Sequence, residues 1–509
     1  MNEGLRARSS SEAVKHSRWP ILAYALLVFA LCWPAWLNGQ AFFLQDTTAY
    51  IKGAASGVAL ISPSPTAQEW LHPSHSARPA PSQPGSTNEH SDTHSKDYSS
   101  SPDKKGVLAG RSIYYGMYLF TITAISSINL VPVITAILTV LTIATVSRSV
   151  GLNHLQTSGL LAILVAVSPL PFFNSMLMPD VFAGLAILAA AAILFISPLY
   201  KWHRYLWAII ILCAVLFHTA NILILSGLLV ITLVIAFVPP ANKKSLVHKT
   251  ALLFVIVLIG IAGEVFFNAA VKHFTHNAPI RPPFISARLI ADGPGTLYAK
   301  NYCSTTAFEI CHYQAALGKA SSDDFLWSLN PDIGIFTLAS KESRELLSHQ
   351  DSAFAIAVFK KYPTEVLRST ALNFLSQLTL VGLEEFNYPK LMITDFSEKI
   401  PEADFKRLQE SKAGKDIFPL ITSEWLILTG IIVSLLVYAY HARLQRRTQP
   451  IFWLSIVILS GILINALICG ALSTPHDRYQ ARVIWLLPLI AFYAYSLRHP
   501  SEAAGFSRS

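Results

Sequence analysis

Apolar runs of about 20 residues recur along the chain and alternate with short polar segments. As a helix, such a run can cross roughly 30 Å of hydrocarbon. A stretch from 205 to 239 is too long for one span, so we place a break near His218–Asn221. The pattern predicts an all-α polytopic membrane protein with about ten spans, at residues 19–38, 126–147, 156–175, 181–199, 205–220, 222–239, 248–270, 421–440, 451–471 and 483–497.

Three regions follow from this pattern. Residues 1–270 form an N-terminal transmembrane region, residues 271–420 a small outward α or α+β domain, and residues 421–509 the last transmembrane helices. Residues 113–125 are expected to form an interfacial helix that leads into the second span. An insertion at 61–110 is rich in Ser, Pro and His, cannot bury enough apolar surface to order itself, and is expected to be a disordered, mobile loop. Its irregular His spacing favours low complexity over a metal site.

The charged residues set an orientation. Only 14% of residues are charged, and the net charge is +9. Basic residues gather in short loops between apolar segments, which is typical of cytoplasmic loops, so both termini are expected in the cytoplasm. These are Lys201, Arg204, Lys243, Lys244, Lys249, Arg443, Arg446, Arg447 and Arg498. We see no basic patch interleaved with aromatic residues, so nucleic acid is not an expected partner; the lipid bilayer is.

With this orientation, residues 40–112, the corner at 178–180, the corner at 218–221, residues 271–420 and residues 473–482 face outward. Asp46, in "FFLQDTTAYIKGA", follows the first span, with Tyr50 one turn later as a possible lining residue of a cavity. Asp46 is either an ordinary interfacial residue or a general base that takes a proton from an attacking hydroxyl. Asp180, in "LMPDVFAGLAI", either caps the next helix or has a functional role.

The segment "STPHDRYQARVIW" (473–485) places Arg478 and Arg482 on the outward side, against the orientation bias. Four residues apart on a helix, they share a face. Guanidinium groups bind phosphate through paired, charge-assisted hydrogen bonds, so a phosphate or diphosphate of an anionic lipid suits them. The alternative is a salt bridge to Asp477 or to another loop. His476 and Tyr479 could help to orient a ligand.

Other polar residues give weaker signals. His218 and Asn221 are either satisfied structural residues or part of a site, and Glu264 either bonds to a neighbouring helix or lines the cavity. Arg281 and Arg288 flank a Pro- and Gly-rich turn and are expected in a loop over the outward face.

Two cysteines lie in the outward segment. Cys303 and Cys311 are either free thiols or a disulfide, which an oxidising exterior would favour. The sequence shows no P-loop, nucleophile elbow, zinc pattern or Rossmann glycine set, so chemistry driven by soluble nucleotides is not expected.

Several of these segments resemble motifs of the GT-C superfamily of membrane glycosyltransferases, which includes protein O-mannosyltransferases and lipid A aminoarabinose transferases. "LQDTTAYIKGA" is similar to the family's first-loop acidic motif, with Thr47 where many relatives have a second acid. "MPDVFAG" resembles the second acidic corner, "HDRYQARVIWLLPL" the closing Arg-Tyr motif, and "FKKYPTEVLRSTALNFL" (359–375) a helix that re-enters the membrane.

The resemblance implies an inverting transferase that moves a sugar from a polyprenyl-phosphate donor to a glycan, lipid or protein acceptor of the cell envelope. Asp46 would be the base, Asp180 would lie near the acceptor or a cation, and Arg478 and Arg482 would bind the lipid phosphate. A divalent cation, if any, would sit on Asp46 and Asp180. The resemblance also implies a bacterial inner membrane with a periplasmic active site.

Other functions remain open: a transporter or flippase for a lipid-linked saccharide, a polysaccharide ligase or polymerase, or a membrane scaffold. The sequence has no evident internal repeat, and its unusual polar residues gather at the outward surface rather than at the midplane. Both observations weaken the transporter hypothesis.

Overall fold

The first half of the chain is a succession of helices in the computed structural model, which describes residues 19–73, 109–237, 243–318, 321–443 and 450–497. The helices are α1 (Trp19–Leu31), α2 (Trp33–Asn38), α3 (Gln45–Ile61), α4 (Pro65–Leu71), α5 (Ile113–Ile125), η2 (Ile128–Leu130), α6 (Val131–Ser149), α7 (His154–Val167), α8 (Leu170–Ser175), α9 (Val181–Phe195), α10 (Lys201–Phe217), α11 (Thr219–Ala236) and α12 (Lys243–Thr275).

The second half is also helical: α13 (Phe284–Asp292), α14 (Pro294–Tyr302), η3 (Glu309–Ala316), α15 (Ser322–Trp327), α16 (Lys341–Lys361), α17 (Pro363–Thr379), η4 (Glu384–Phe386), α18 (Lys390–Ser397), α19 (Glu402–Glu410), α20 (Leu420–Ala442), α21 (Pro450–Leu472), α22 (Asp477–Ile484) and α23 (Leu486–Ser496). Within the described ranges no β-strand forms, and the one isolated bridge pairs Phe42 with Met176.

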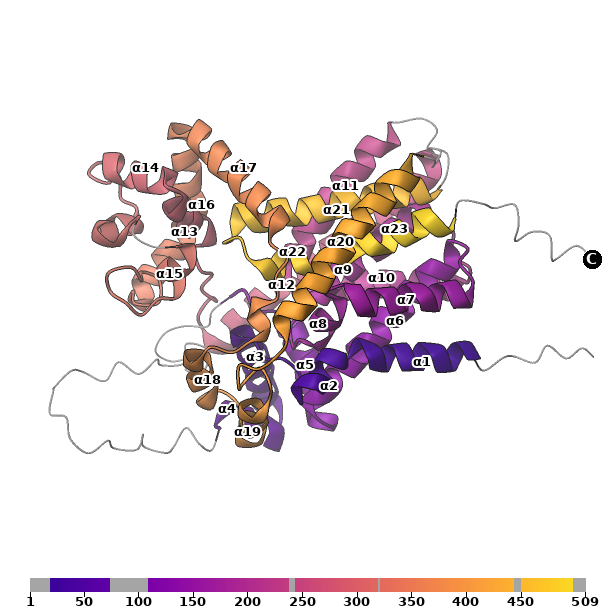
Figure 1. The fold of residues 1–509 in the computed structure, drawn as a ribbon. Helices are drawn as coiled ribbons and strands as arrows, with labels where there is room; N and C mark the ends of the chain where they lie inside the picture. Colours follow the sequence, from indigo (N-terminus) through magenta and orange to yellow (C-terminus); the bar gives the residue numbers. More distant parts are fainter. Residues whose placement is uncertain (1–18, 74–108, 238–242, 319–320, 444–449, 498–509) are drawn as a thin grey trace, which may run out of the picture.

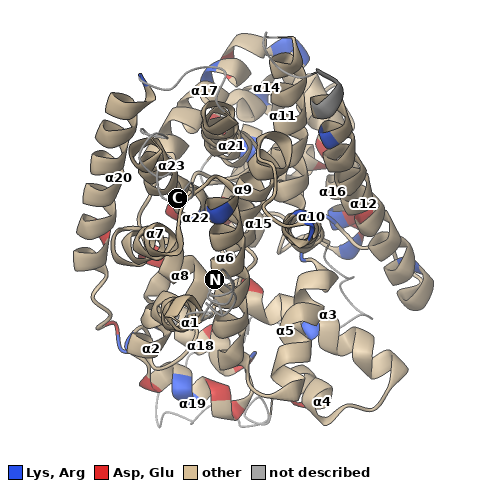
Figure 2. Ribbon diagram, turned by 90° about the vertical axis from the view of Figure 1, so that its right-hand side faces the viewer, with Lys and Arg blue, Asp and Glu red and all other residues tan. Residues whose placement is uncertain are grey.

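Among the residues that the structure describes, five segments are long and apolar enough to cross a membrane: Ile128–Ser149, Thr219–Ala236, Leu246–Thr275, Leu420–Ala442 and Pro450–Leu472. Only 28% of the apolar window of α20 and 33% of that of α12 is buried inside the protein. α11 and α21 carry no Asp, Glu, Lys or Arg (Figure 2). Apolar faces of this size on the outside of a protein fit lipid hydrocarbon. The chain is therefore a helical protein with membrane-spanning character.

The other five predicted spans are shorter or interrupted. Residues 19–38 break at Cys32, residues 156–175 break at Ser168–Pro169, and residues 483–497 break at Trp485. Pro34 and Pro171 lie in the first turns of the helices that follow two of these breaks, as expected because proline cannot continue a helix. α9 has 15 residues and α10 has 17. The break near 218 is confirmed, since α10 ends at Phe217 and α11 begins at Thr219. The count of ten spans stays a prediction.

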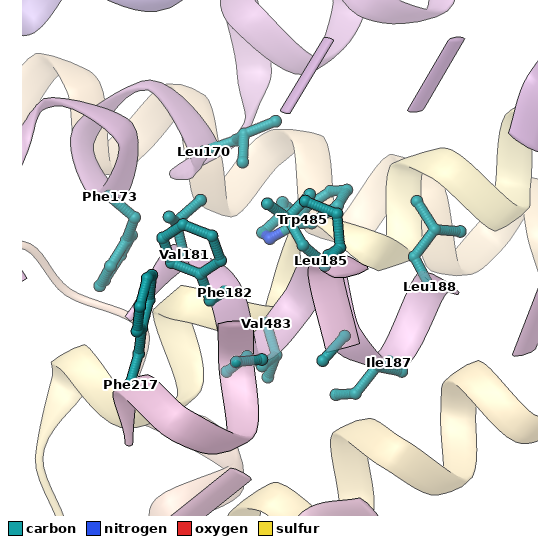
Figure 3. Packing of buried hydrophobic residues seen from close by; sticks show 14 of the residues in the cluster. Leu170, Phe173, Val181, Phe182, Leu185, Ile187, Leu188, Phe217, Val483 and Trp485 are labelled. Atoms are coloured by element: carbon teal, nitrogen blue, oxygen red, sulfur yellow. The ribbon is translucent and has the colours of Figure 1, made fainter. Parts of the chain in front are cut away.

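α9 is the central helix of the body. Every residue from Val181 to Leu194 is buried, and its neighbours include α10, α21 and α22. Figure 3 shows Trp485 and Val483 packed beside Phe182 and Leu185. The approach is close because residue 184 is glycine: a Cβ there would lie 2.5 Å from Nε1 of Trp485. This packing fixes α22, which carries the two predicted arginines, against the start of α9.

The helices α13 to α16 form a small domain beside the main helical body (Figure 1). It has a hydrophobic core of its own, drawn from residues between 280 and 358, with Ile335 and Phe354 at its centre. The predicted domain 271–420 is thus divided, because Phe386, Phe396 and Leu408 pack into the core of the main body instead. The described part of the domain is helical, and Cys303 and Cys311 form a disulfide within it.

Two predicted loops contain helices. Residues 65–71, inside the expected mobile insertion, form α4, in which Ala67 and Trp70 are buried. The rest of the insertion, residues 74–108, lies outside the described residues. The segment 281–295, expected as a loop, forms α13 and the start of α14. In both cases apolar side chains of the segment pack against distant parts of the chain, and the local sequence does not show those contacts.

The helical body has two distinct ends. In Figure 1 the small domain, α4, α18 and α19 lie at its left, whereas α1 begins and α23 ends at its right. The connections after α6 and α9 lie at the right end, and α20 ends there. Lys201 and Arg204 belong to the first turn of α10, and Arg443 directly follows α20. Arg446, Arg447 and Arg498 lie outside the described residues. Asp46, Asp180 and Arg478 belong to segments of the opposite end.

Candidate functional site

The segments that carry Asp46 and Asp180 run side by side. Phe42 N–H donates to the Ser175 carbonyl over 3.0 Å, and Leu177 N–H donates to the Phe42 carbonyl over 2.9 Å. The Thr47 hydroxyl accepts the Leu44 N–H (2.9 Å) and donates to the Leu177 carbonyl (3.1 Å). Thr47 therefore ties the first loop to the corner that ends at Asp180, a task that an acidic side chain could not perform as a donor at neutral pH.

Asp180 and Arg482 form a buried ion pair. Arg482 Nη1 lies 3.3 Å from Asp180 Oδ1, and the two side chains are 1% and 2% exposed. Arg482 also donates to Asn465 Oδ1 over 2.9 Å from Nη2 and 3.3 Å from Nε. The capping interpretation of Asp180 is wrong, because its side chain makes no capping hydrogen bond to α9. The salt-bridge alternative for Arg482 is confirmed, with Asp180 of another loop as its partner.

Arg478 lies on the same face, one turn earlier. Its Nε is 3.7 Å from Asp180 Oδ1, too far for a hydrogen bond, and is buried without a hydrogen-bond partner among the described residues. The guanidinium groups of Arg478 and Arg482 lie 5.2 and 5.5 Å from the ring centre of Tyr479. Burial lowers the pKa of Arg478, but Asp180 and Glu385 raise it, so that it lies above its ordinary value and the group stays cationic. Arg478 thus offers unused donors to an anion.

Asp46 forms a more open ion pair with Arg111. Arg111 Nη2 lies 2.5 Å from Asp46 Oδ1, and the side chains are 31% and 27% exposed. Burial raises the pKa of Asp46, but the positive charges of Arg111 and Arg478 outweigh it, so the pKa lies below its ordinary value. Asp46 is therefore ionised at neutral pH and feels the charge of Arg478. Close packing of α3 on α5 holds Asp46 here: a Cβ on Gly116 would lie 2.2 Å from the Tyr50 carbonyl oxygen.

Sequence reasoning missed Arg111. It belongs to an outward segment and breaks the orientation bias just as Arg478 does, so the signal was present. Tyr50, proposed to line a cavity, is 2% exposed and packs edge-on against Tyr115 at 5.1 Å.

Glu385 was also missed. It lies in η4, within electrostatic range of Arg478 and Asp180, and burial raises its pKa despite the opposing charge of Arg478. Its Oε2 is buried without a hydrogen-bond partner among the described residues. No local pattern marks this residue, because its neighbours in space come from α9 and α22.

The start of α22 is held by the small domain and by α17. His476 Nε2 lies 2.9 Å from Asp323 Oδ2, and Thr474 Oγ1 lies 2.5 Å from Ser322 Oγ. Gln377 exchanges two hydrogen bonds with the backbone of His476, of 2.8 and 3.0 Å. His476, predicted to orient a ligand, is thus engaged by Asp323.

The remaining candidates have local partners. His218 Nδ1 accepts the Ala220 N–H (3.1 Å), and Asn221 Nδ2 donates to the Ala214 carbonyl (2.9 Å), so both stabilise the break between α10 and α11. His218 also lies within electrostatic range of Arg482 and Asp180. Glu264 Oε1 accepts the Thr219 hydroxyl over 3.2 Å and so bonds to a neighbouring helix.

Arg281 and Arg288, expected in a loop over the outward face, belong to the small domain, where Arg288 lies in α13. Arg288 pairs with Asp292, whose Oδ2 accepts from Asn373 of α17 over 2.8 Å. Arg281 is exposed, and its backbone N–H donates to the Ser348 hydroxyl over 3.2 Å.

A divalent cation does not fit the residues seen here. Asp46 and Asp180 each face a guanidinium group, which neutralises the charge a cation would need. Within the described ranges, no three His, Cys, Asp or Glu side chains gather as a metal site. We therefore derive no step through a metal.

Searches against protein-family models, curated proteins and solved structures found no match to this chain. The functional argument therefore rests on the chain's own residues and geometry.

Proposed function

We propose that the protein is a membrane glycosyltransferase that moves a sugar from a polyprenyl-phosphate donor to an acceptor hydroxyl on the outer face of the membrane. The observation that carries this proposal is the placement of the cationic Arg478 near Asp46. The buried Nε of Arg478 lacks a hydrogen bond among the described residues. Its charge acts on the Asp46 carboxylate, which is 27% exposed. A cation with free donors beside a carboxylate suits the departure of a phosphate and the uptake of a proton in one reaction.

In the proposed reaction, the acceptor oxygen forms a bond to the anomeric carbon of the sugar. The bond between that carbon and the phosphate oxygen breaks, and its electron pair leaves with the phosphate, beside Arg478. The acceptor proton passes to the Asp46 carboxylate. In-line attack inverts the anomeric carbon, and no nucleotide is consumed because the leaving group is already a phosphate ester.

Asp180 and Arg482 have a positioning role in this scheme. Their side chains are 2% and 1% exposed and bonded to one another, so neither is open to a ligand. Asp180 also attracts Arg478 over 3.7 Å and so helps to aim it. Arg478 rather than Arg482 is the phosphate-binding arginine of the proposal.

The surroundings suit a lipid substrate. α12 and α20 expose apolar side chains that favour a bilayer, and Asp46 and Arg478 lie in segments at one end of the helical body. We propose that this end faces the periplasm of a bacterial inner membrane, with ten spans and both termini in the cytoplasm, because the basic loops gather at the opposite end.

The test is a transfer assay with the full-length chain in proteoliposomes. A polyprenyl-phosphate hexose labelled in the sugar is supplied with an envelope extract as the source of acceptors, and mass spectrometry follows the label. We expect Asp46→Asn to lower transfer by roughly 10²- to 10⁴-fold while donor binding persists. Asp332→Asn, a matched change of an exposed aspartate in the small domain, should leave transfer unchanged.

Two outcomes would contradict the proposal. Full transfer by Asp46→Asn would remove Asp46 as the base. Movement of intact labelled donor between leaflets without any transfer by the unaltered protein would identify a transporter instead.

A further inference from the structure

The segment Leu383–Tyr388, which contains Glu385, is clamped between the Asp46 loop and α22. Phe386 packs edge-on against Phe42 at 5.0 Å and Phe172 at 5.1 Å. The Phe43 N–H donates to the Tyr388 hydroxyl over 2.8 Å. On the other side, a Cβ on Gly382 would lie 2.7 Å from Asp477 Oδ2. The segment therefore lies next to the residues that precede Asp46 and next to the start of α22, and buried contacts hold it in place.

Glu385 and Asn387 each have a side-chain oxygen that is buried without a hydrogen-bond partner among the described residues, and Glu385 is the carboxylate of the two. It forms no hydrogen bond or ion pair with any residue the structure describes, and its Oε2 is buried. A buried acceptor left without a donor is unfavourable, and most buried polar groups in proteins have a partner, so Glu385 is an unusual neighbour for Arg478.

The unmatched groups define what a ligand must offer. Arg478 Nε is a donor without a hydrogen bond, whereas Glu385 Oε2 is an acceptor without one. A simple phosphate brings acceptors for Arg478 but leaves the Glu385 carboxylate unsatisfied. A molecule with a phosphate joined to hydroxyl groups satisfies both groups at once.

We propose that Glu385 accepts hydrogen bonds from hydroxyl groups of the sugar whose phosphate lies on Arg478, and that it sets the choice of sugar. This inference rests on the proposed function and adds a residue that selects the substrate. A carboxylate acceptor distinguishes sugars well, because a sugar that lacks the matching hydroxyl leaves a buried charged group unpaired.

The test measures donor affinity with the full-length protein in detergent. The ligands are polyprenyl phosphate without a sugar, polyprenyl-phosphate hexose, and a series of hexose donors that each lack one hydroxyl. The proteins are the unaltered chain, Glu385→Ala and Glu384→Gln. Glu384 is the matched control, since it is the exposed carboxylate next in the chain.

We expect one missing hydroxyl to weaken binding to the unaltered chain by roughly tenfold or more, and to have no further effect in Glu385→Ala. Glu385→Ala should bind sugar-free polyprenyl phosphate as the unaltered chain does. Glu384→Gln should behave as the unaltered chain with every ligand.

Three results would overturn the inference. If Glu385→Ala weakens all ligands equally, including polyprenyl phosphate, Glu385 acts through Arg478 and does not contact the sugar. If the unaltered chain binds all ligands equally, the phosphate site stands and the sugar contact is wrong. If it binds none of them, the proposed function fails and this inference with it.

Discussion

Two ion pairs lie at the same end of the molecule and differ in their access to solvent. Asp180 and Arg482 are 2% and 1% exposed, and Asn465 takes up further donors of the guanidinium. Asp46 and Arg111 are 27% and 31% exposed. The backbone hydrogen bonds of Phe42 with Ser175 and Leu177 hold the two carboxylate-bearing segments next to one another, so the contrast does not come from distance.

From this contrast we infer a structural role for the Asp180–Arg482 pair and keep the proposed catalytic role for Asp46. Breaking a buried pair leaves a charge in a low-dielectric interior, so we expect the Asp180–Arg482 pair to stay intact when a ligand binds. The more exposed Asp46–Arg111 pair is partly screened by water, so in the proposed reaction Asp46 would release Arg111 and accept a proton at lower cost. Arg478 lies between the two pairs and feels both carboxylates.

The largest effect should come from breaking the buried pair. We expect Asp180→Ala to lower the free energy of unfolding by about 3–5 kcal/mol, because Arg482 is left buried and unpaired. Thermal unfolding of the purified protein measures this. The double variant Asp180→Leu with Arg482→Met should regain most of the loss without regaining transfer. An Asp180→Ala variant as stable as the unaltered chain would contradict the framework role.

Removing Arg478 should affect the ligand more than the fold. We expect Arg478→Ala to weaken binding of polyprenyl phosphate by roughly tenfold to a hundredfold, the worth of one or two charge-assisted hydrogen bonds. Donor titration by intrinsic fluorescence measures it. Arg281→Ala, at an exposed arginine of the small domain, is the matched control. Equal affinities for Arg478→Ala and the control would place the phosphate elsewhere.

The Asp46–Arg111 pair should affect the pH dependence of transfer. Because the pKa of Asp46 lies below its ordinary 3.8, its ion pair stabilises the fold above the unfolded-state pKa, and this contribution is lost as pH falls through the lower folded-state pKa. The acid limb of the transfer rate should therefore lie below pH 3.8. Arg111→Gln removes the charge that lowers the pKa of Asp46 the most and should move the acid limb to higher pH. If the acid limb of Arg111→Gln lies at the same pH as that of the unaltered chain, the group that titrates is not the partner of Arg111.

The smallest effect concerns the contact between the small domain and α22. The hydrogen bond to Asp323 raises the pKa of His476 above 6.5, so this contact contributes stability below pH 6.5 that is lost as pH rises through the folded-state pKa. Both side chains are more than two-fifths exposed, so the contribution is under about 1 kcal/mol. Hydrogen exchange of residues 473–477, corrected for intrinsic rates, should rise from pH 6 to 8. Asp323→Asn should lack that rise, and an identical rise in both proteins would assign it to another group.

Much of the site could be predicted from the sequence. Asp46, Asp180, Arg478 and Arg482 stood out because orientation rules placed them on one side, and the structure brings their segments together. The spacing of Arg478 and Arg482 predicted a shared face but not which of them is buried. That depends on the depth to which α22 packs against α9 and on the position of Asn465, which no local pattern contains.

The rest depended on contacts between distant segments. The break at Cys32 is indicated by Pro34 and the one at Trp485 by Pro488, whereas the close packing of Trp485 against Gly184 joins segments that are far apart in the sequence. The position of Glu385 depends on the packing of Phe386 against phenylalanines from two distant segments, Phe42 and Phe172–Phe173. The sequence also does not show that apolar residues between 383 and 418 pack into the core of the main body, because that packing depends on distant segments.

The central claim is that an anionic lipid phosphate binds in the open half of the site, on Arg478 and beside Asp46. An experimental structure of the full-length protein with polyprenyl phosphate tests it most directly. The account predicts the phosphate within hydrogen-bond distance of the Arg478 guanidinium, with the Asp180–Arg482 pair intact. A phosphate bound away from Arg478, or one that breaks the buried pair to reach Arg482, would contradict it.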